Sequence, residues 1–341
     1  MHVTVVGAGV LGRIYGARLA ADGEEVAFVV RPDRAAETSP FFIEQVNAGD
    51  RREVIDHPVR LTEIPEGTDL VLVAVRFHEL LPAPPEAAPE EGPSQNKIQI
   101  QIQKSFDLRE ILRGGGSLKA PVVVLTPMLQ GQAEALNKAS GRPIVPAMPG
   151  VAGYLNERGA VRYWIPAATS TLLDENAGGP SSRAALEALA RHLSRIGLPT
   201  RLEPDVAALN AATTITFFPL IAAIDAGSGI DGVLGNKELM GAVLDAAKES
   251  GALARKVGKP ATWGHLLMKF VGPFTLKPGI ALARRLFPES VRFMESHFGP
   301  KLHEQHLAMG ESILEIGRAN NISMPALERL LSILRRRQAA G

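Results

Sequence analysis

The first thirty residues change from strand-like to helical and back to strand-like spacing of apolar positions. The apolar run 3–6 leads directly into glycines, and helical spacing follows. A second apolar run covers 26–30 after a short Asp22-Gly23 connection. A β-branched run, a glycine turn, a helix and a second strand form one βαβ unit. The sequence therefore predicts that the chain begins with part of a parallel sheet.

Further apolar runs extend this sheet. Runs 70–75 and 122–125 are continuous and bounded by polar residues, which is typical of parallel strands covered on both faces. A strand-like stretch follows at 161–165. We predict an α/β fold in which residues 1–175 form a Rossmann-like, doubly wound domain.

Amphipathic helical spacing dominates from about Ser181 onward. We therefore predict an all-α second domain over residues 176–341. The expected helices cover 181–197, 205–226, 237–256, 311–320 and 326–337.

The stretch 82–105 fits neither pattern. It is rich in proline, and Ile98, Ile100 and Ile102 then alternate with glutamine. A period of two predicts an edge strand or a flap. We assign it as a surface insertion without a catalytic role, because long polar loops vary freely.

Composition narrows the classes of protein. The 341 residues are 45% hydrophobic and 21% charged, which excludes a disordered chain. Lys and Arg number 37 against 36 Asp and Glu, so no strong overall field attracts nucleic acid or an anionic membrane. Cysteine is absent, which excludes thiolate nucleophiles and Cys-based zinc sites. No signal peptide or membrane span is evident, so we expect a cytoplasmic protein.

The glycine turn carries the clearest chemical signal. It consists of Gly7, Ala8, Gly9, Val10, Leu11 and Gly12. Between a strand and a helix, Gly7 permits the tight turn, Gly9 lets phosphates approach the backbone, and Gly12 allows close packing of the helix on the strand. Backbone N–H groups and the helix dipole would face a pyrophosphate. We predict a dinucleotide site.

The end of the second strand indicates which dinucleotide. Proteins that bind the form without a 2′-phosphate place Asp or Glu there, to accept hydrogen bonds from the ribose hydroxyls. This chain has Arg31 instead, with Arg34 nearby. A guanidinium can pair with a 2′-phosphate, so we predict NADP(H) as the cofactor. The alternative is that Arg31 is a solvated surface residue.

Several stretches together resemble the ketopantoate reductase (2-dehydropantoate 2-reductase) family. They are residues 7–31, Val73-Ala74-Val75-Arg76, 234–258 and 319–331. The resemblance implies a Rossmann-like domain, a helical domain and hydride transfer from NADPH to a small 2-keto acid. It also implies cofactor contacts extending to Val75 and Arg76, and a possible homodimer.

The same resemblance places two polar residues on the mid-chain helix. The family's general acid is a lysine, and counting back from Pro219 puts Asn210 at that position. An amide can polarise a carbonyl but cannot deliver a proton as an ammonium does. Thr214 corresponds to a substrate-contacting asparagine one turn later. The alternative is that both side chains simply make local hydrogen bonds within a buried helix.

Other family positions have also changed. Arg76 replaces a lysine and keeps a charge that could bind a substrate carboxylate. Met128 falls in a turn where the family has a polar amide, although Gln130 could supply an amide to the substrate. Glu304 corresponds to the family's acidic substrate-site residue, its alternative being an exposed helical glutamate.

His303 and His306 flank Glu304 with helical i, i+3 spacing. We expect no metal there, because no clear third ligand and no HExxH spacing accompany them. A histidine is nevertheless a chemically suitable replacement proton donor, so both remain secondary candidates.

The sequence leaves three hypotheses open. The first is an NADPH-dependent oxidoreductase of the ketopantoate reductase type that acts on a 2-keto acid-like substrate other than ketopantoate. The second is an NADP(H)-binding sensor or scaffold with little or no hydride transfer. The third is ketopantoate reduction with a displaced proton donor.

Overall fold

The computed structural model describes most of the chain. The described residues are 1–46, 51–80, 107–114, 120–166, 169–179, 182–258, 275–298 and 302–338. Within them the chain forms two compact units. Unit 1 contains Met1–Thr126 and Gly131–Pro204, and unit 2 contains Pro127–Gln130 and Asp205–Gly341. The predicted stretch 82–105 lies outside the described residues.

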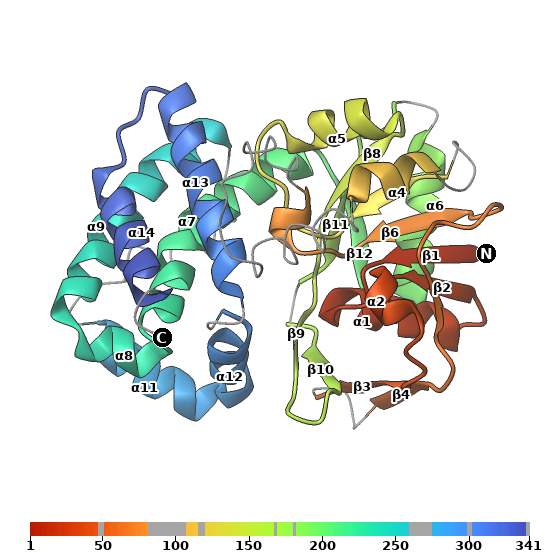
Figure 1. Cartoon of the computed structure of the whole chain (residues 1–341), viewed down its shortest axis with the longest axis horizontal. Helices are drawn as coiled ribbons and strands as arrows, with labels where there is room; N and C mark the ends of the chain where they lie inside the picture. Colours follow the sequence, from red (N-terminus) through yellow and green to blue (C-terminus); the bar gives the residue numbers. More distant parts are fainter. Residues whose placement is uncertain are drawn as a thin grey trace, which may run out of the picture. The chain divides into compact units, whose positions relative to one another are not determined.

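Unit 1 is built on an eight-stranded sheet flanked by helices (Figure 1). The strand order is β12-β11-β8-β7-β6-β1-β2-β5, and all neighbours pair in parallel except β8 with β11. The strands are β1 (His2–Val6), β2 (Glu25–Val29), β5 (Val59–Leu61), β6 (Leu70–Val73), β7 (Val122–Val124), β8 (Ile144–Met148), β11 (Thr171–Asp174) and β12 (Thr200–Glu203). The helical elements are α1 (Val10–Ala21), α2 (Pro32–Ala35), η1 (Phe77–Leu80), α4 (Leu108–Gly114), α5 (Gln132–Ser140) and α6 (Arg183–Arg195).

This sheet confirms the predicted Rossmann-like, doubly wound class. The apolar runs predicted as strands form β1, β2, β6 and β7, and each of β6 and β7 is buried along its length. Continuous burial follows from cover on both faces, because helices pack above and below a parallel sheet.

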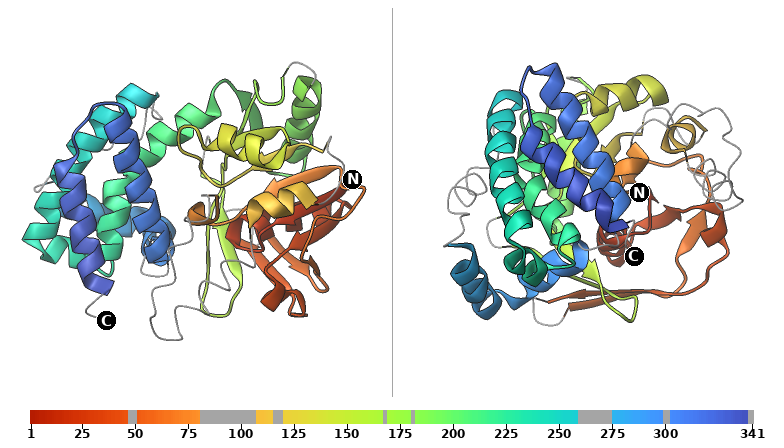
Figure 2. Two further views of the ribbon diagram at one scale, coloured as in Figure 1. Left: turned by 45° about the horizontal axis from the view of Figure 1, so that its top comes forward. Right: turned by 60° about the vertical axis from the view of Figure 1, so that its left-hand side comes forward.

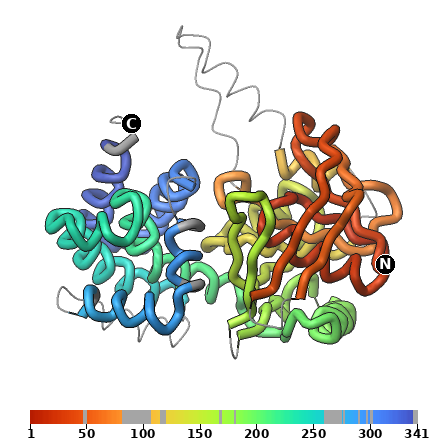
Figure 3. Tube along the Cα trace, turned by 90° about the horizontal axis from the view of Figure 1, so that it is seen from below, coloured from red at the N-terminus to blue at the C-terminus, as the bar shows by residue number. Residues whose placement is uncertain are grey.

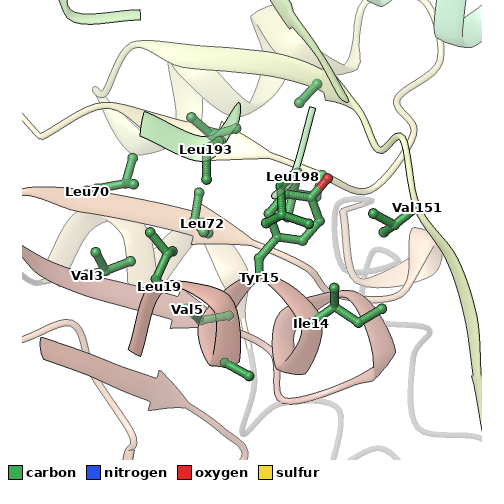
Figure 4. Packing of buried hydrophobic residues seen from close by; sticks show 14 of the residues in the cluster. Val3, Val5, Ile14, Tyr15, Leu19, Leu70, Leu72, Val151, Leu193 and Leu198 are labelled. Atoms are coloured by element: carbon green, nitrogen blue, oxygen red, sulfur yellow. The ribbon is translucent and has the colours of Figure 1, made fainter. Parts of the chain in front are cut away.

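The core of unit 1 lies between this sheet and its helices. Tyr15 of α1 is buried among side chains of the strands and of the α6 region, including Leu72 and Leu198 (Figure 4). The Tyr15 hydroxyl makes a hydrogen bond with Thr171 Oγ1, at 2.5 Å. Burial raises the pKa of Tyr15, so this hydroxyl acts as a structural group.

A second, four-stranded sheet belongs to the same unit. Its order is β4-β3-β10-β9, with β3 (Phe41–Gln45), β4 (Arg51–Ile55), β9 (Ala152–Leu155) and β10 (Val161–Trp164). The predicted strand at 161–165 therefore pairs here and not in the main sheet. Arg18 of α1 is buried against this sheet, donates to the Tyr163 hydroxyl at 2.7 Å and forms an ion pair with Glu53.

The expected boundary between the domains was 175/176, whereas the two units divide after Pro204. The difference comes from α6 and β12. The side chains of Leu186 and Leu193 in α6 join the core of the main sheet, and β12 pairs in parallel with β11. An amphipathic helix shows in sequence that it has a buried face, but not which domain buries it.

Unit 2 is helical in its described residues (Figure 2). Its helices are α7 (Val206–Ala226), α8 (Ile230–Gly235), α9 (Lys237–Val257), α11 (Leu276–Leu286), α12 (Pro288–His297), α13 (His303–Ala319) and α14 (Pro325–Gln338). Helix α7 packs against α9, α13 and α14, and Figure 3 traces the same helices as a tube. The predicted all-α character of this part is confirmed.

Helix α7 is also the one helix among the described residues that is long and apolar enough to cross a membrane. More than half of its apolar window is buried inside the protein, since α7 is the helix around which α9 and α14 pack. Its apolar composition is that of a core helix.

Candidate functional site

The topology of the main sheet defines where a ligand is expected. From β1 the chain moves to β2 on one side, and β6 lies on the other side of β1. In open α/β sheets, ligands bind outside the carboxyl ends of the strands where the strand order reverses. The turn after β1 and the residues after β6 lie at this switch point.

The three glycines of the turn have different surroundings. Gly7 has φ of +99°, and a Cβ there would lie 2.6 Å from the Ala74 carbonyl oxygen. A Cβ on Gly12 would lie 2.0 Å from the Gly7 carbonyl oxygen. A Cβ on Gly9 would meet no atom of the described residues within 4 Å. Gly7 and Gly12 therefore close the turn, whereas Gly9 borders open space.

The N-terminus of α1 opens onto the same space. Gly9 is its N-cap, and no side chain caps the helix. The N–H groups in the first turn of a helix have no partner within the helix, and the helix dipole makes this end attractive to anions. Ala8, Val10 and Leu11, which were predicted to contact the cofactor, belong to this backbone frame. The turn therefore fits a pyrophosphate.

The Arg13 side chain connects the glycine turn to the rest of unit 1 by hydrogen bonds. Its Nε donates to the Ala8 carbonyl at 2.9 Å, and Nη1 donates to the Gly159 carbonyl at 3.2 Å. Its guanidinium lies 4.1 Å from the centre of the Phe41 ring, where a cation and a π face attract. Burial, with repulsion from Arg34 and Arg60, lowers the pKa of Arg13 to about 10. The sequence analysis missed this role, although Arg13 directly follows the last glycine.

The charges of Arg34, Arg60 and Arg13 all attract the Glu37 carboxylate, although only Arg34 binds it directly, and we call these four residues the arginine cluster. Arg34 binds Glu37 with both ends of its fork, Nε to Oε1 at 2.8 Å and Nη2 to Oε2 at 2.9 Å. These hydrogen bonds, with the charges of Arg34, Arg60 and Arg13, hold the pKa of Glu37 below its ordinary value. Arg60 donates to the carbonyls of Glu37 and Ser39 and lies 4.7 Å from the Phe41 ring centre.

Arg31 differs from the members of the arginine cluster. It follows β2 and is the N-cap residue of α2, so it lies where the sequence predicted it. Within the part of the chain that the structure describes, its side chain makes no hydrogen bond or ion pair. Its guanidinium donors are available to a ligand.

The residues after β6 form the other side of the switch point. The Val75 carbonyl accepts a hydrogen bond from Thr126 Oγ1 at 2.6 Å, which links the ends of β6 and β7. The Arg76 backbone N–H donates to Glu79 Oε2 at 2.7 Å, and the Arg76 side chain is exposed. Val75 therefore contributes backbone, and Arg76 offers an exposed cation.

The predicted catalytic residues lie in unit 2 but are not all close together. Asn210 is buried and Thr214 half-buried on α7, one turn apart. Glu304 is exposed on α13, next to His303, which contacts Asp225 at the other end of α7. Fifteen residues at about 1.5 Å each separate Asn210 from Asp225 by roughly 22 Å. Unit 2 thus brings Asn210 and Thr214 together but keeps Glu304 far from Asn210.

The histidines that flank Glu304 belong to a buried carboxylate cluster, which we define as Asp225, His303 and His306. Asp225 Oδ2 lies 3.1 Å from His303 Nδ1 and 2.9 Å from His306 Nδ1. Asp225 and His306 are fully buried. The Nε2 atoms of His303 and His306 are also buried, and neither has a hydrogen-bond partner within the ranges that the structure describes. A single charge within an apolar helix was the sequence signal for this cluster, and it was missed.

The turn after β7 changes units. Pro127–Gln130 groups with unit 2, whereas the residues on either side group with unit 1. Met128 is fully buried and Gln130 is exposed. Met128 is therefore a packing residue, and the exposed Gln130 amide remains a candidate substrate contact.

One further group of side chains among the described residues has the spacing of metal ligands, namely Asp22, Glu24 and His192. Both carboxylates already have cationic partners. Arg195 binds Asp22 through two nitrogens, and the α-amino group of Met1 pairs with Glu24. These ion pairs account for the group without a metal.

Comparison with known proteins agrees with this architecture. Residues 3–101 match the family model described as ketopantoate reductase PanE/ApbA. The 2-dehydropantoate 2-reductase from Geobacter metallireducens GS-15 superimposes with a TM-score of 0.65 at 20% identity, covering 98% of this chain and 99% of that chain. The fold is that of the ketopantoate reductases. The resemblance predicted from the sequence is confirmed.

Other solved structures extend the comparison beyond one substrate. A PanE/ApbA family ketopantoate reductase from Ralstonia eutropha JMP134 has a TM-score of 0.62 at 19% identity, covering 98% of this chain and 97% of that chain. A D-mandelate dehydrogenase solved with NADH has a TM-score of 0.59 at 15% identity, covering 100% and 99%. No curated protein matches the chain. At these identities the likeness to solved structures establishes the ketopantoate reductase fold, and it leaves cofactor preference and substrate open.

Proposed function

We propose that this protein is an NADPH-dependent oxidoreductase that reduces a small 2-keto acid-like carbonyl compound other than ketopantoate. The observation that carries the proposal is the open space beside Gly9 at the switch point, between the uncapped end of α1 and the residues after β6. When bound there, the nicotinamide nucleotide would supply the hydride.

The residues of unit 1 would bind and select the nucleotide. The turn from Gly7 to Gly12 would hold the pyrophosphate on backbone N–H groups. Arg31, whose side chain has no partner among the described residues, would bind the 2′-phosphate. Val75 and the exposed Arg76 would contact the cofactor, and Arg76 could also hold the carboxylate of a keto acid.

The residues of unit 2 would act on the carbonyl. The Asn210 amide and the Thr214 hydroxyl can donate hydrogen bonds to a carbonyl oxygen and stabilise the negative charge that develops there. Neither is an acid that supplies a proton near neutral pH, so the proton that converts the developing alkoxide to an alcohol would come from solvent. We retain Glu304 and Gln130 as proposed contacts to substrate groups more distant from the carbonyl.

We further propose a cytoplasmic protein that acts on a small molecule, with no role for nucleic acid or a membrane, and that assembles as a homodimer. One structural relative, the ketopantoate reductase from Staphylococcus aureus, is described as dimeric; its TM-score is 0.61 at 12% identity, covering 100% of this chain and 99% of that chain. The molar mass in solution, measured by light scattering, tests the assembly.

The test of cofactor preference is a titration of the protein with NADPH and with NADH, repeated with Arg31→Ala. Loss of a charge-assisted contact is expected to weaken NADPH binding by about tenfold or more and to leave NADH binding nearly unchanged. Equal weakening of both nucleotides would assign Arg31 a general role, and no binding of either would overturn the proposal.

The test of activity is incubation with NADPH and a panel of 2-keto acids, followed at the nicotinamide absorbance. Turnover with at least one keto acid other than ketopantoate is expected. A second candidate function is an NADP(H) sensor or scaffold, favoured by Asn210 in place of the family's lysine. Tight NADPH binding without turnover would support it. Strong ketopantoate reduction by Asn210→Lys would show that only the proton donor was lost.

A further inference from the structure

We propose that Glu37 sets the preference between nucleotides with and without a 2′-phosphate, because its carboxylate occupies Arg34 until a 2′-phosphate displaces it. This inference rests on the proposed function, which places the nucleotide at the switch point beside β2. In this inference Glu37 lowers the affinity for NADPH, whereas Arg31 raises it.

The contact between Arg34 and Glu37 has the geometry of anion recognition. Two parallel hydrogen bonds, at 2.8 and 2.9 Å, join the guanidinium edge to both carboxylate oxygens. A guanidinium binds a phosphate with the same two-pronged geometry. Glu37 therefore uses the edge of Arg34 that a 2′-phosphate would use.

Arg34 is also the member of the arginine cluster whose partner can be exchanged. Arg13 and Arg60 donate to backbone carbonyls and lie against Phe41, so the fold fixes both. Arg34 and Glu37 have side-chain exposures of 40% and 37%. Solvent, and hence a ligand, can reach this pair.

The local charges favour exchange for a more negative group. Three guanidinium groups act on the Glu37 carboxylate, and the attraction of Asp33 for Arg34 is weaker than that of Glu37. Even with Asp33 included, the cations exceed the anions, and Arg31 adds another. A phosphate carries up to two negative charges, so it neutralises this group better than one carboxylate does.

The experiment uses adenosine 2′,5′-bisphosphate and 5′-AMP as probes that differ only in the 2′-phosphate. Calorimetric titration of the whole protein is compared for wild type and Glu37→Gln. We expect Glu37→Gln to tighten binding of the bisphosphate about two- to fivefold, the upper part of the range of an exposed ion pair, and to leave 5′-AMP binding nearly unchanged.

Two variants serve as controls. Asp33→Asn removes a carboxylate from α2, the short helix that carries Arg34, without removing a hydrogen bond to Arg34, and its effect on the bisphosphate should be smaller. In an Arg34→Ala background, Glu37→Gln should have no effect, because the exchange passes through Arg34. Additive effects of the two substitutions would contradict the mechanism.

The outcomes separate this inference from the proposed function. Unchanged or weaker bisphosphate binding by Glu37→Gln would overturn the inference, the latter by showing that Glu37 positions Arg34 for the ligand. Wild-type protein that binds neither probe, nor NADPH or NADH, would overturn the proposed function as well. Binding of both probes with no response to Glu37→Gln would leave the proposed function standing alone.

Discussion

The arginine cluster of unit 1 and the carboxylate cluster of unit 2 differ in how their charged groups are balanced and how accessible these groups are to solvent. In the arginine cluster, cations outnumber the carboxylate and the pair that can be exchanged is accessible to solvent. In the carboxylate cluster, one fully buried carboxylate lies within hydrogen-bond distance of two imidazoles. The arginine cluster therefore has an excess of positive charge that can attract an anion. The carboxylate cluster instead joins the end of α7 to the start of α13.

The difference separates binding from stability. Substitution of an excess charge at a solvent-accessible site changes the free energy of unfolding little, but it changes which ligands the protein attracts. A buried charge without its partner is costly to the fold. Substitutions in the two clusters should therefore change different measurements.

The largest effect is expected for Asp225→Ala. Its removal leaves the buried His306 and the partly buried His303 without their common hydrogen-bond partner, and each buried polar group left unsatisfied lowers the free energy of unfolding by about 1–3 kcal/mol. Denaturant unfolding measures this, and nucleotide affinity of the folded variant should be unchanged. Asp231→Ala, which removes an exposed partner of Arg284, is the matched control and should change stability little. Equal stability of the two variants would break the comparison.

The next effects are expected for two glycines of the same turn. Substitution of Gly9 should weaken nucleotide binding, whereas substitution of Gly12 should lower the stability of the fold. Gly9→Ala adds a methyl group in open space, so the unfolding free energy should be unchanged while nucleotide affinity falls by about tenfold or more. Gly12→Ala places its methyl group against the Gly7 carbonyl, and such overpacking costs about 1–3 kcal/mol. Thermal unfolding and nucleotide titration of both variants check this. A destabilised Gly9→Ala would show that the space is needed by the fold itself.

The smallest effect is the pH dependence of the Arg34–Glu37 pair. The pKa of Glu37 is lower in the folded protein than its ordinary value of 4.5, chiefly through its hydrogen bonds to Arg34. The pair therefore stabilises the fold fully above the ordinary pKa, and this contribution is lost as the pH falls through the lowered pKa. For a solvent-accessible pair it amounts to less than about 1 kcal/mol.

Comparison of wild type and Glu37→Gln across pH 3 to 7, by denaturant unfolding, measures this contribution. Their difference should be constant near neutrality and shrink toward the acidic end. A difference that persists unchanged to the lowest pH would show that the carboxylate contributes nothing as an ion.

The sequence predicted the parts of the fold that local patterns determine. β1, the turn and α1 followed from an apolar run and three glycines, because a positive φ and close helix packing leave local marks on the chain. Strands β3 (Phe41–Gln45) and β4 (Arg51–Ile55) were not predicted. β4 pairs with β3, and β3 pairs with β10, which is far away in the chain.

In the candidate site, too, the residues that belong to local sequence patterns could be predicted, whereas the contacts between distant segments could not. Arg31 and the glycines were identified from their positions in the sequence, and their roles toward a cofactor remain predictions. The contact of Arg13 with Phe41 and that of Asp225 with His303 depend on tertiary structure, which no motif contains. Glu304 was matched by counting from a glycine, and counting cannot show that α13 meets α7 at the end opposite Asn210.

Because Pro127–Gln130 groups with unit 2, the helical unit is not one continuous stretch of polypeptide. A fragment starting at Asp205 would lack Met128 and Leu129, which are both buried in the whole chain. Excision at that junction would therefore remove two buried apolar side chains that group with unit 2, and an isolated fragment would need those four residues grafted back to reproduce the native packing.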